Sequence, residues 1–359
     1  MRPSAPGAAE PNGHEVVTRL LGYDVRLLFE QALLAESDLI RLQARLFAVA
    51  SRLGFREDRI ERLRLVAAEL ATNQSKYGGG RGLLQAWEVR LGARMAIDLF
   101  AIDYGVGIAN LGMALRDGYS SGGTLGKGLG AATRLASRFA VLTRTASSAQ
   151  VPWHGTAAWA RFEADAGAGA DDLWDLGLYR RSYQDARENG DGFALCVGTG
   201  IQTVHLDALG HGREAAALTD AARGTFSCAR SLAENLAAIE RLAALRRGAA
   251  VCAYACDASG ALTWSGAGDM QACLLQNNTR VSLGLGRGVY GHVHGHLPTK
   301  GLEWVSGGLL VTASDGLRSS WPQGLAELAG HPPQLLAYFL GQVWGRTNDD
   351  RSCLVVRRV

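Results

Sequence analysis

Residues 203–212 read TVHLDALGHG, a short β-branched and apolar run that ends in an aspartate and a glycine-rich turn. Aspartates stand next to other apolar runs in the second half of the chain. Gly190-Asp191 precedes an apolar run, Asp315-Gly316 ends another, and Asp349-Asp350 introduces the last one. A single Asp-Gly at a strand end is a turn signal. Taken together, carboxylates placed at four strand edges predict a cluster of oxygen ligands, which Mg²⁺ and Mn²⁺ prefer.

Around these carboxylates the pattern is one of short strands separated by glycine-rich turns, with helical segments between them. The predicted helices span residues 214–223, 227–246 and 333–344. The predicted strands span residues 193–197, 203–206, 251–256, 262–265, 309–313 and 353–356. Strands and helices grouped in this way predict two sheets with helices packed outside them.

Four segments in this order resemble the metal-dependent PPM-class protein serine/threonine phosphatases, especially the sporulation stage II protein E branch, over about residues 177–359. They are DALGHG (207–212), TWSGAGDMQACLL (263–275), LLVTASDGL (309–317) and NDDRSCLVV (348–356). The resemblance implies a PPM-type αββα sandwich that binds two Mn²⁺ or Mg²⁺ ions. The implied ligands are Asp191, Asp207, Asp315, Asp349 and the backbone carbonyl of Ala208.

The same resemblance implies that a metal-activated water attacks a phosphoserine or phosphothreonine, with Asp207 at the catalytic centre. His211 is a candidate proton donor to the leaving oxygen, although packing of its loop is an equal alternative. The chain departs from the family pattern at three positions. Ala208 replaces the usual glycine, Asp269 stands where asparagine is common, and Ser352 replaces threonine. The backbone carbonyl at position 208 can still bind a metal ion with alanine in place of glycine if the backbone conformation there accommodates a Cβ.

The first half of the chain predicts a different α/β sandwich. Apolar residues recur at helical spacing over residues 33–53 and 58–77, strands are predicted at 83–91, 93–102 and 157–162, and a third helix at 126–139. Glu69 and Asn73 lie four residues apart on the apolar face of the second helix. They are either polar residues satisfied by neighbouring backbone, or an amide that holds Mg²⁺ and a carboxylate that acts as a base.

Two glycine-rich turns follow. Asp103-Tyr-Gly105-Val-Gly107 ends a strand, and residues 122–130 (GGTLGKGLG) open a helix where backbone donors, a lysine and a positive dipole end favour phosphate. In this order, ELATN (69–73), DYGVGI (103–108) and TLGKGLGAATRLASRF (124–139) resemble the nucleotide-binding boxes of the GHKL ATPase superfamily, closest to its anti-sigma-factor and stressosome serine/threonine kinases. The likeness covers about residues 33–162.

That resemblance implies a GHKL fold using ATP and Mg²⁺, with Asp103 on the adenine, Asn73 on the Mg²⁺ ion and Glu69 as catalytic base. Thr156 would supply a late adenine-side contact. The remaining nucleotide-binding positions would be Gly105, Gly107, Gly126, Lys127, Gly128, Leu129 and Gly130. No phospho-acceptor histidine motif precedes the Asn73 helix, which argues against a two-component histidine kinase.

The glycine-rich segment EADAGAGADD (163–172) predicts a linker. We therefore expect a flexible tail (1–16), a GHKL domain (17–163), a linker (164–176) and a phosphatase domain (177–359). The net charge of +3, from 37 Lys plus Arg against 34 Asp plus Glu, favours neither nucleic acid nor a membrane as a partner. The six cysteines lack CxxC spacing and predict buried free thiols in a cytoplasmic protein. His292, His294 and His296 alternate but fall in a glycine-rich segment, which disfavours a metal site there.

Together the two resemblances imply a partner-switching regulator. Its kinase-like half would phosphorylate, and its phosphatase half would dephosphorylate, a STAS-domain anti-sigma-factor antagonist or a stressosome-like protein. A sigma factor and a second copy of the chain are further partners left open. The alternative is a nucleotide-dependent partner-binding module whose phosphatase-like domain is regulatory or inactive.

Overall fold

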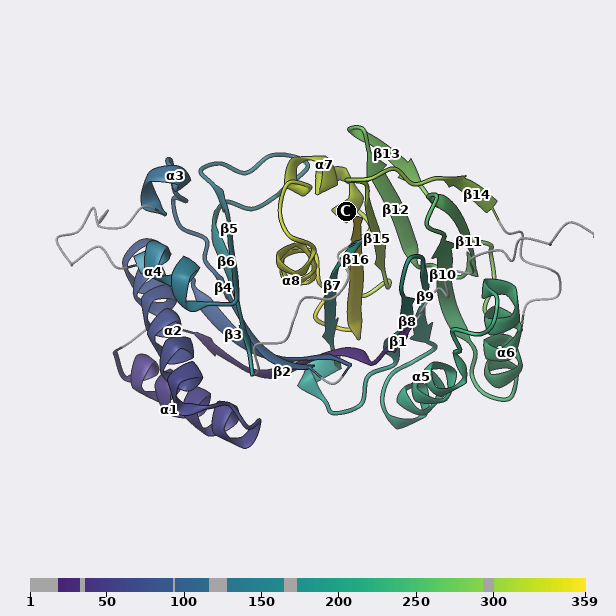
Figure 1. The fold of residues 1–359 in the computed structure, drawn as a ribbon, viewed down its shortest axis with the longest axis horizontal. Helices are drawn as coiled ribbons and strands as arrows, with labels where there is room; N and C mark the ends of the chain where they lie inside the picture. The colour runs from purple at the N-terminus through teal and green to yellow at the C-terminus, as the bar shows by residue number, and fades with distance from the viewer. Residues whose placement is uncertain (1–18, 33–35, 93, 116–127, 165–172, 293–299) are drawn as a thin grey trace, which may run out of the picture.

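The computed structural model of the chain describes residues 19–32, 36–92, 94–115, 128–164, 173–292 and 300–359. Within these ranges the strands form three sheets whose named strand pairs are all antiparallel (Figure 1). The helices lie on the outer faces of the sheets and, in one case, between two of them. The predicted mixed α/β class is therefore confirmed.

The first half of the chain forms one sheet with helices on one face (Figure 1). In spatial order its strands are β2 (Tyr23–Ala32), β3 (Leu83–Leu91), β4 (Arg94–Ile102), β6 (Gly155–Glu163) and β5 (Arg138–Arg144). The covering helices are α1 (Glu36–Arg52), α2 (Glu57–Tyr77) and α4 (Gly128–Leu135), and α3 (Leu111–Ala114) follows β4. The apolar stripe of α2, including Leu63, Val66 and Leu70, is buried in this core, as its helical spacing predicts.

The second half contains two sheets that pack face to face, with helices outside each of them (Figure 1). One sheet has the order β1 (Arg19–Leu21), β8 (Asp191–Val197), β9 (Ile201–Ala208), β10 (Ala249–Cys256), β11 (Ala261–Ala267) and β14 (Lys300–Glu303). The other has the order β13 (Thr279–Ser282), β12 (Gln271–Gln276), β15 (Leu309–Ala313), β16 (Arg351–Arg358) and β7 (Trp174–Arg181). The remaining elements are α5 (Arg213–Thr225), α6 (Leu232–Ala244), α7 (Leu325–Leu328), α8 (Pro333–Val343) and two 3₁₀ turns, η1 (Tyr183–Asp185) and η2 (Trp321–Gly324).

Helices α5 and α6 cover the outer face of the first of these sheets, and α8 covers the outer face of the second, which is the predicted αββα sandwich (Figure 1). Helix α8 also packs against the first-half sheet, so it is apolar nearly all round and almost wholly buried. One core cluster accordingly joins Trp87, Phe100 and Trp153 of the first half to Tyr338 and Phe339 of α8. The two halves share a hydrophobic core.

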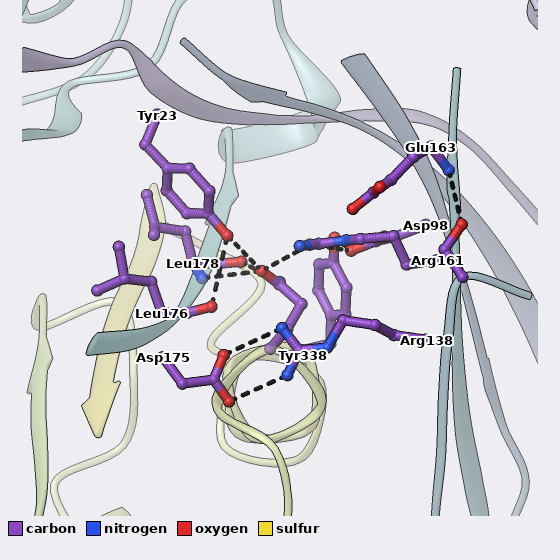
Figure 2. Close-up of polar contacts among 11 residues, drawn as sticks. Tyr23, Asp98, Arg138, Arg161, Glu163, Asp175, Leu176, Leu178 and Tyr338 are labelled. Atoms are coloured by element: carbon purple, nitrogen blue, oxygen red, sulfur yellow. Dashed lines mark hydrogen bonds and ion pairs between the residues drawn. The ribbon is translucent and has the colours of Figure 1, made fainter. Parts of the chain in front are cut away.

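A buried polar network crosses the same interface (Figure 2). Arg161 in β6 forms two hydrogen bonds with Asp98 in β4, at 2.7 and 2.8 Å. The hydroxyl of Tyr338 in α8 donates to Asp98 at 3.0 Å. The side chain of Gln334, one turn earlier in α8, accepts from Arg161 at 3.3 Å and from the hydroxyl of Tyr23 in β2 at 3.0 Å. These hydrogen bonds hold α8 in a fixed position against the first-half sheet.

Some predicted boundaries differ from the structure. The predicted helix at 126–139 ends at Leu135, because Arg138 to Arg144 pair with β6 as an edge strand. Strands β2 and β7 were not predicted, and β7 begins at Trp174, inside the predicted linker (164–176). The predicted tail and most of that linker lie outside the described residues. Strand β1, which lies at the start of the predicted GHKL domain (17–163), pairs with β8 and so joins a sheet of the second half.

The prediction of six free thiols is wrong for two cysteines. Cys196 at the end of β8 and Cys228 after α5 form a disulfide with their Cα atoms 5.5 Å apart. Sequence spacing did not reveal this pair because 32 positions separate the cysteines, and only packing of α5 and α6 on the sheet brings them together. The other cysteines are free and buried, namely Cys252, Cys256, Cys273 and Cys353. In the described part of the chain, no helix has the length and apolarity needed to cross a bilayer.

Candidate active site and nucleotide pocket

The first pair of predicted metal ligands lies on neighbouring strands. The register of β8 and β9 places Asp191 directly opposite Asp207. Residues opposed in this way have Cβ atoms about 4.5–5.5 Å apart, and like charges there destabilise a sheet. Asp191 is nevertheless 1% exposed. Two facing carboxylates in a buried position therefore require a positive partner or shared protons.

The second pair enters from the other sheet. Ala313 is opposite Cys353 in the β15–β16 ladder, and the pairing continues where the Ser314 N–H donates to the Ser352 carbonyl at 3.1 Å. Asp315 therefore leaves β15 at the end of the sheet where Asp349 and Asp350 lead into β16. The structure thus brings all four predicted carboxylate ligands to one end of the sandwich.

Two serines join the sheets at this point. The hydroxyls of Ser314 and Ser352 donate to Oδ2 of Asp191 at 2.8 and 2.6 Å. Oδ1 of Asp191 is buried and has no hydrogen-bond partner within the described residues. Because an unpartnered buried carboxylate oxygen is costly, this atom is a ready ligand for a cation. Ser352, which departs from the family's threonine, keeps the hydroxyl that performs this role.

The pKa values of the carboxyl groups in this cluster are also shifted. Burial raises the pKa of Asp207, and Asp191, Asp315, Asp349 and Asp269 raise it further by repulsion. Burial likewise raises the pKa of Asp191, although the two serine hydrogen bonds oppose the shift. Carboxyl groups that repel one another in a partly desolvated site favour binding of divalent cations, which cancel the repulsion.

The donor set fits Mg²⁺ or Mn²⁺, because it consists of carboxylate oxygens with one unpartnered buried atom. No three histidine, cysteine, aspartate or glutamate side chains among the described residues already converge on a single point. Ala208 meets the condition for a carbonyl ligand, since it lies in β9 without a positive φ and its side chain is buried against α5.

The sequence did not single out two residues that organise this centre. Asp350 accepts hydrogen bonds from the Tyr183 and Gly190 N–H groups at 2.7 and 2.6 Å, which holds the loop before Asp191. His205 lies between Thr312 and Ser352, at 2.9 and 2.7 Å, and burial lowers its pKa to about 3, so it is neutral. The alternation of strand side chains was an available signal, since His205 and Asp207 share one face of β9.

His211 lies on the exposed turn after β9. Its ring centroid is 5.2 Å from that of Tyr183, whose N–H donates to Asp350 beside the predicted ligand Asp349. By contrast, His292 lies in an exposed turn, and His294 and His296 lie outside the described residues.

A pocket of 410 Å³ opens beside Ala208, between the start of α5 and the end of α6. Apolar side chains, including Leu209 and Leu218, line it together with Arg213, Arg246 and Arg247. Glu214 also lines it and forms an ion pair with Arg247 at 2.6 Å. The pocket is therefore apolar inside with a basic rim, and it adjoins the carboxylate cluster through Ala208.

The predicted adenine contact lies in the first half of the chain, at the end of β4. Oδ1 of Asp103 accepts hydrogen bonds from the Gly105 and Thr156 N–H groups at 2.9 and 3.0 Å. Asp103 is 5% exposed, and burial raises its pKa although these hydrogen bonds oppose the shift. The structure thus brings together three of the predicted nucleotide-binding residues, Asp103, Gly105 and Thr156.

Two glycines of this loop are sterically required. A Cβ on Gly105 would lie 1.9 Å from the Tyr77 carbonyl oxygen. Gly107 has a φ of +69°, and a Cβ there would lie 2.4 Å from the Arg144 carbonyl oxygen. Only glycine allows the backbone to pass this close to its neighbours.

Glu69 and Asn73 also face the predicted phosphate-binding helix. A Cβ built on Gly128, the first residue of α4, would lie 3.6 Å from Glu69 Oε2 and 3.9 Å from Asn73 Nδ2. Both predicted residues therefore lie beside the start of α4. Leu129 and Gly130 follow in α4, whereas Gly126 and Lys127 lie outside the described residues.

No protein-family model and no curated protein matches the chain. Among solved structures, the RsbU and RsbW domains of a Mycobacterium tuberculosis protein are 23% identical over 52% of this chain and 60% of that chain, with a TM-score of 0.46. The PP2C phosphatase domain of SpoIIE from Bacillus subtilis with a fragment of its regulatory domain is 13% identical over 89% of this chain and 94% of that chain, with a TM-score of 0.43.

RsbX in complex with magnesium is 13% identical over 54% of this chain and 99% of that chain, with a TM-score of 0.47. The structural neighbours named here are thus phosphatase domains of the PP2C and SpoIIE type or Rsb-type proteins. With TM-scores under 0.5, these similarities are too distant to assign an activity, a substrate or a partner to this chain.

Proposed function

We propose that the second half of the chain is a metal-dependent protein phosphatase that hydrolyses phosphoserine or phosphothreonine. The observation that supports this most is the meeting of Asp191, Asp207, Asp315 and Asp349 at one end of two sheets, with Oδ1 of Asp191 buried and unpartnered. These side chains, with the Ala208 carbonyl, would hold two Mn²⁺ or Mg²⁺ ions. When bound, such ions supply a nucleophilic water and neutralise charge on the transferring phosphoryl group.

The residues around the ligands have separate tasks in this proposal. Ser314 and Ser352 orient Asp191, and neutral His205 positions Ser352 without adding a charge. His211 is exposed, lies four residues after Asp207 and packs beside Tyr183, so we assign it the role of donating a proton to the departing serine or threonine oxygen.

The pocket beside Ala208 is the proposed binding place for the polypeptide that flanks the phosphorylated residue. Its apolar interior suits one apolar side chain, and Arg213, Arg246 and Arg247 suit neighbouring acidic groups. A STAS-domain antagonist or a stressosome-like protein is the substrate that the sequence resemblance suggests. The geometry itself supports only an acidic segment with an apolar residue next to the phosphate.

A direct test compares hydrolysis of an aryl phosphate with Mn²⁺ by the wild-type protein and by Asp207→Asn. We expect metal-dependent turnover that the substitution abolishes, since it removes one ligand charge from the centre of the cluster. Leu209→Ala is the matched control, because it changes the pocket next to Asp207 without touching a carboxylate. Equal turnover by Asp207→Asn would show that the metal assignment is wrong.

For the first half of the chain we propose an ATP-binding domain with Asp103 at the adenine and Asn73 at a Mg²⁺ ion. The proximity of Glu69 and Asn73 to Gly128 supports this assignment. Protein kinase activity with Glu69 as base is the finer proposal, and a nucleotide-dependent partner-binding module is the alternative.

Glu69→Ala separates these two proposals. Loss of partner phosphorylation with nucleotide affinity retained supports the kinase, because only the base has been removed. Unchanged phosphorylation rules that role out for Glu69. Nucleotide binding without phosphorylation by the wild-type protein supports the partner-binding module.

A further inference from the structure

Three buried aromatic residues connect the predicted adenine contact to the second half of the chain. The indole N–H of Trp153 donates to the backbone carbonyl of Asp103 at 2.9 Å. The Trp153 ring packs edge-on against Phe339 of α8, with ring centroids 4.8 Å apart. Phe339 in turn packs edge-on against Trp344, with centroids 6.0 Å apart. This aromatic row (Trp153, Phe339 and Trp344) is at most 2% exposed at each position.

The far end of the aromatic row is hydrogen-bonded to the segment that follows Asp315. The Arg318 N–H donates to the Trp344 carbonyl at 2.9 Å, and the Arg346 N–H donates to the Gly316 carbonyl at 2.8 Å. Leu317 and Gly345 form an isolated bridge between the same two segments. The segment 344–346 also leads directly to Asp349. The end of α8 therefore holds both metal-ligand segments of the second sheet.

A second set of contacts joins α7 to the end of β5 and to the loop between β5 and β6. Arg144 forms an ion pair with Glu327 of α7 at 2.7 Å, and the Ser148 hydroxyl donates to Glu327 at 3.2 Å. The chain runs from this loop into β6, where the Thr156 N–H donates to Asp103. The loop of Asp103 is thus joined to the Asp315 segment through the aromatic row, and to α7 through Arg144 and Ser148.

The interface between the halves restricts movement of α8 relative to the first-half sheet. Gln334 of α8 accepts a hydrogen bond from Arg161, and Tyr338 of α8 donates one to Asp98. Figure 2 shows Tyr338 beside Asp98 and Arg161. Protein interiors are close-packed, so a displacement of one buried ring must be matched by its neighbours or leave a void. A ligand that repositions the Asp103 loop would therefore shift Trp153, and α8 and residues 316–318 would have to adjust.

We propose that the nucleotide pocket is an allosteric site for the metal centre, so that a nucleotide bound at Asp103 changes the affinity with which Asp315 and Asp349 hold divalent metal. This inference rests on the proposed function, because both ligands must bind. It adds a regulatory role for the nucleotide that is separate from phosphoryl transfer. Thermodynamic linkage requires the effect to be reciprocal, so the state of the metal centre must alter nucleotide affinity by the same factor.

Because the coupling is reciprocal, it can be tested by measuring nucleotide affinity without measuring enzyme turnover. The affinity for a non-hydrolysable ATP analogue is measured by calorimetry on the full chain at one saturating Mg²⁺ concentration, in the wild type and in Asp207→Asn. We expect the two dissociation constants to differ by about five-fold or more. Phe339→Leu should bring this ratio close to one, because it removes the edge contacts of the aromatic row. Phe226→Leu, a buried phenylalanine in the α5–α6 core, is the matched control and should leave the ratio unchanged.

Trp153→Phe provides a second variant if Phe339→Leu does not fold. It keeps a ring against Phe339 but removes the indole N–H that binds the Asp103 carbonyl, and it should also lower the ratio. Equal nucleotide affinity in the wild type and Asp207→Asn would overturn this inference alone, provided that the wild type hydrolyses aryl phosphate with Mn²⁺. Failure of the wild type to bind nucleotide would overturn both this inference and the ATP-binding proposal.

Discussion

Arg161 and Arg138 lie opposite each other in the β5–β6 ladder, and each forms an ion pair, one buried within the first-half sheet and one exposed toward β7, which permits a quantitative prediction. Arg161 pairs with Asp98 at 2.7 Å, with side chains 4% and 0% exposed. Arg138 pairs with Asp175 at 3.1 Å, with side chains 43% and 22% exposed. Both guanidinium groups also lie over the Trp159 ring, at 5.2 and 5.3 Å. The two arginines are therefore matched in their aromatic contact.

Replacing Arg161 by methionine removes the charge that compensates Asp98 and leaves a carboxylate in the core with the Tyr338 hydroxyl as its remaining donor. Breaking a buried pair in this way costs about 3–5 kcal/mol of unfolding free energy. Arg138→Met should cost about 0.2–1 kcal/mol, because an exposed pair is screened by water. Denaturation in urea, followed by tryptophan fluorescence and by circular dichroism, measures both values.

The shared core adds a second expectation to the same experiment. Since α8 packs against sheets from both halves, the two optical probes should report a single coincident transition in the wild-type protein. The double variant Asp98→Leu/Arg161→Met should recover much of the loss, because no unpaired charge remains. An Arg161→Met protein no less stable than Arg138→Met would refute the reasoning, since burial would then have made no difference.

Three further outcomes follow from the sites. Ser352→Ala, which removes the hydroxyl between Asp191 and His205, should weaken Mn²⁺ binding by about 10–100-fold, whereas Ser352→Thr should not. Calorimetric titration with Mn²⁺ distinguishes the two variants, and equal affinities would show that Ser352 does not support the metal centre. Arg246→Ala should raise the KM for an acidic phosphopeptide and leave kcat/KM for an aryl phosphate unchanged. A KM for the phosphopeptide equal to that of the wild type would show that the basic rim does not contact the substrate. Gly105→Ala should abolish nucleotide binding, because the new methyl would lie 1.9 Å from the Tyr77 oxygen. Gly22→Ala, where a Cβ meets no atom within 4 Å and φ is not positive, is the control, and retained nucleotide affinity in Gly105→Ala would contradict the close approach.

The sequence predicted local structure well where periodicity was strong. The stripe through Leu63, Val66 and Leu70 gave α2 within one residue at its start, and the strand at 83–91 matches β3. The helix predicted over 126–139 was too long, because Phe139 and Val141 pair with β6 and tertiary pairing overrode the local helical pattern. Strand β7 was missed because the run from Trp174 lies beside a glycine-rich stretch and carries its own glycine.

The four carboxylates were predicted from their positions at strand ends, and the structure brings them to one end of the sandwich. Their partners were not predictable in the same way. His205 and Ser352 are 147 positions apart and meet only because the two sheets pack face to face. The Cys196–Cys228 disulfide and the Asp98–Tyr338 hydrogen bond have the same origin.

By itself, the sequence indicated the candidate site residues and most of the helices and strands, because turn residues and hydrophobic periodicity act over a few positions. The tertiary structure alone decided that α8 lies between two sheets and that the loop of Asp103 connects to the segment of Asp315. It also decided that Oδ1 of Asp191 is buried without a partner. These features depend on contacts between residues far apart in the chain, which no local pattern encodes.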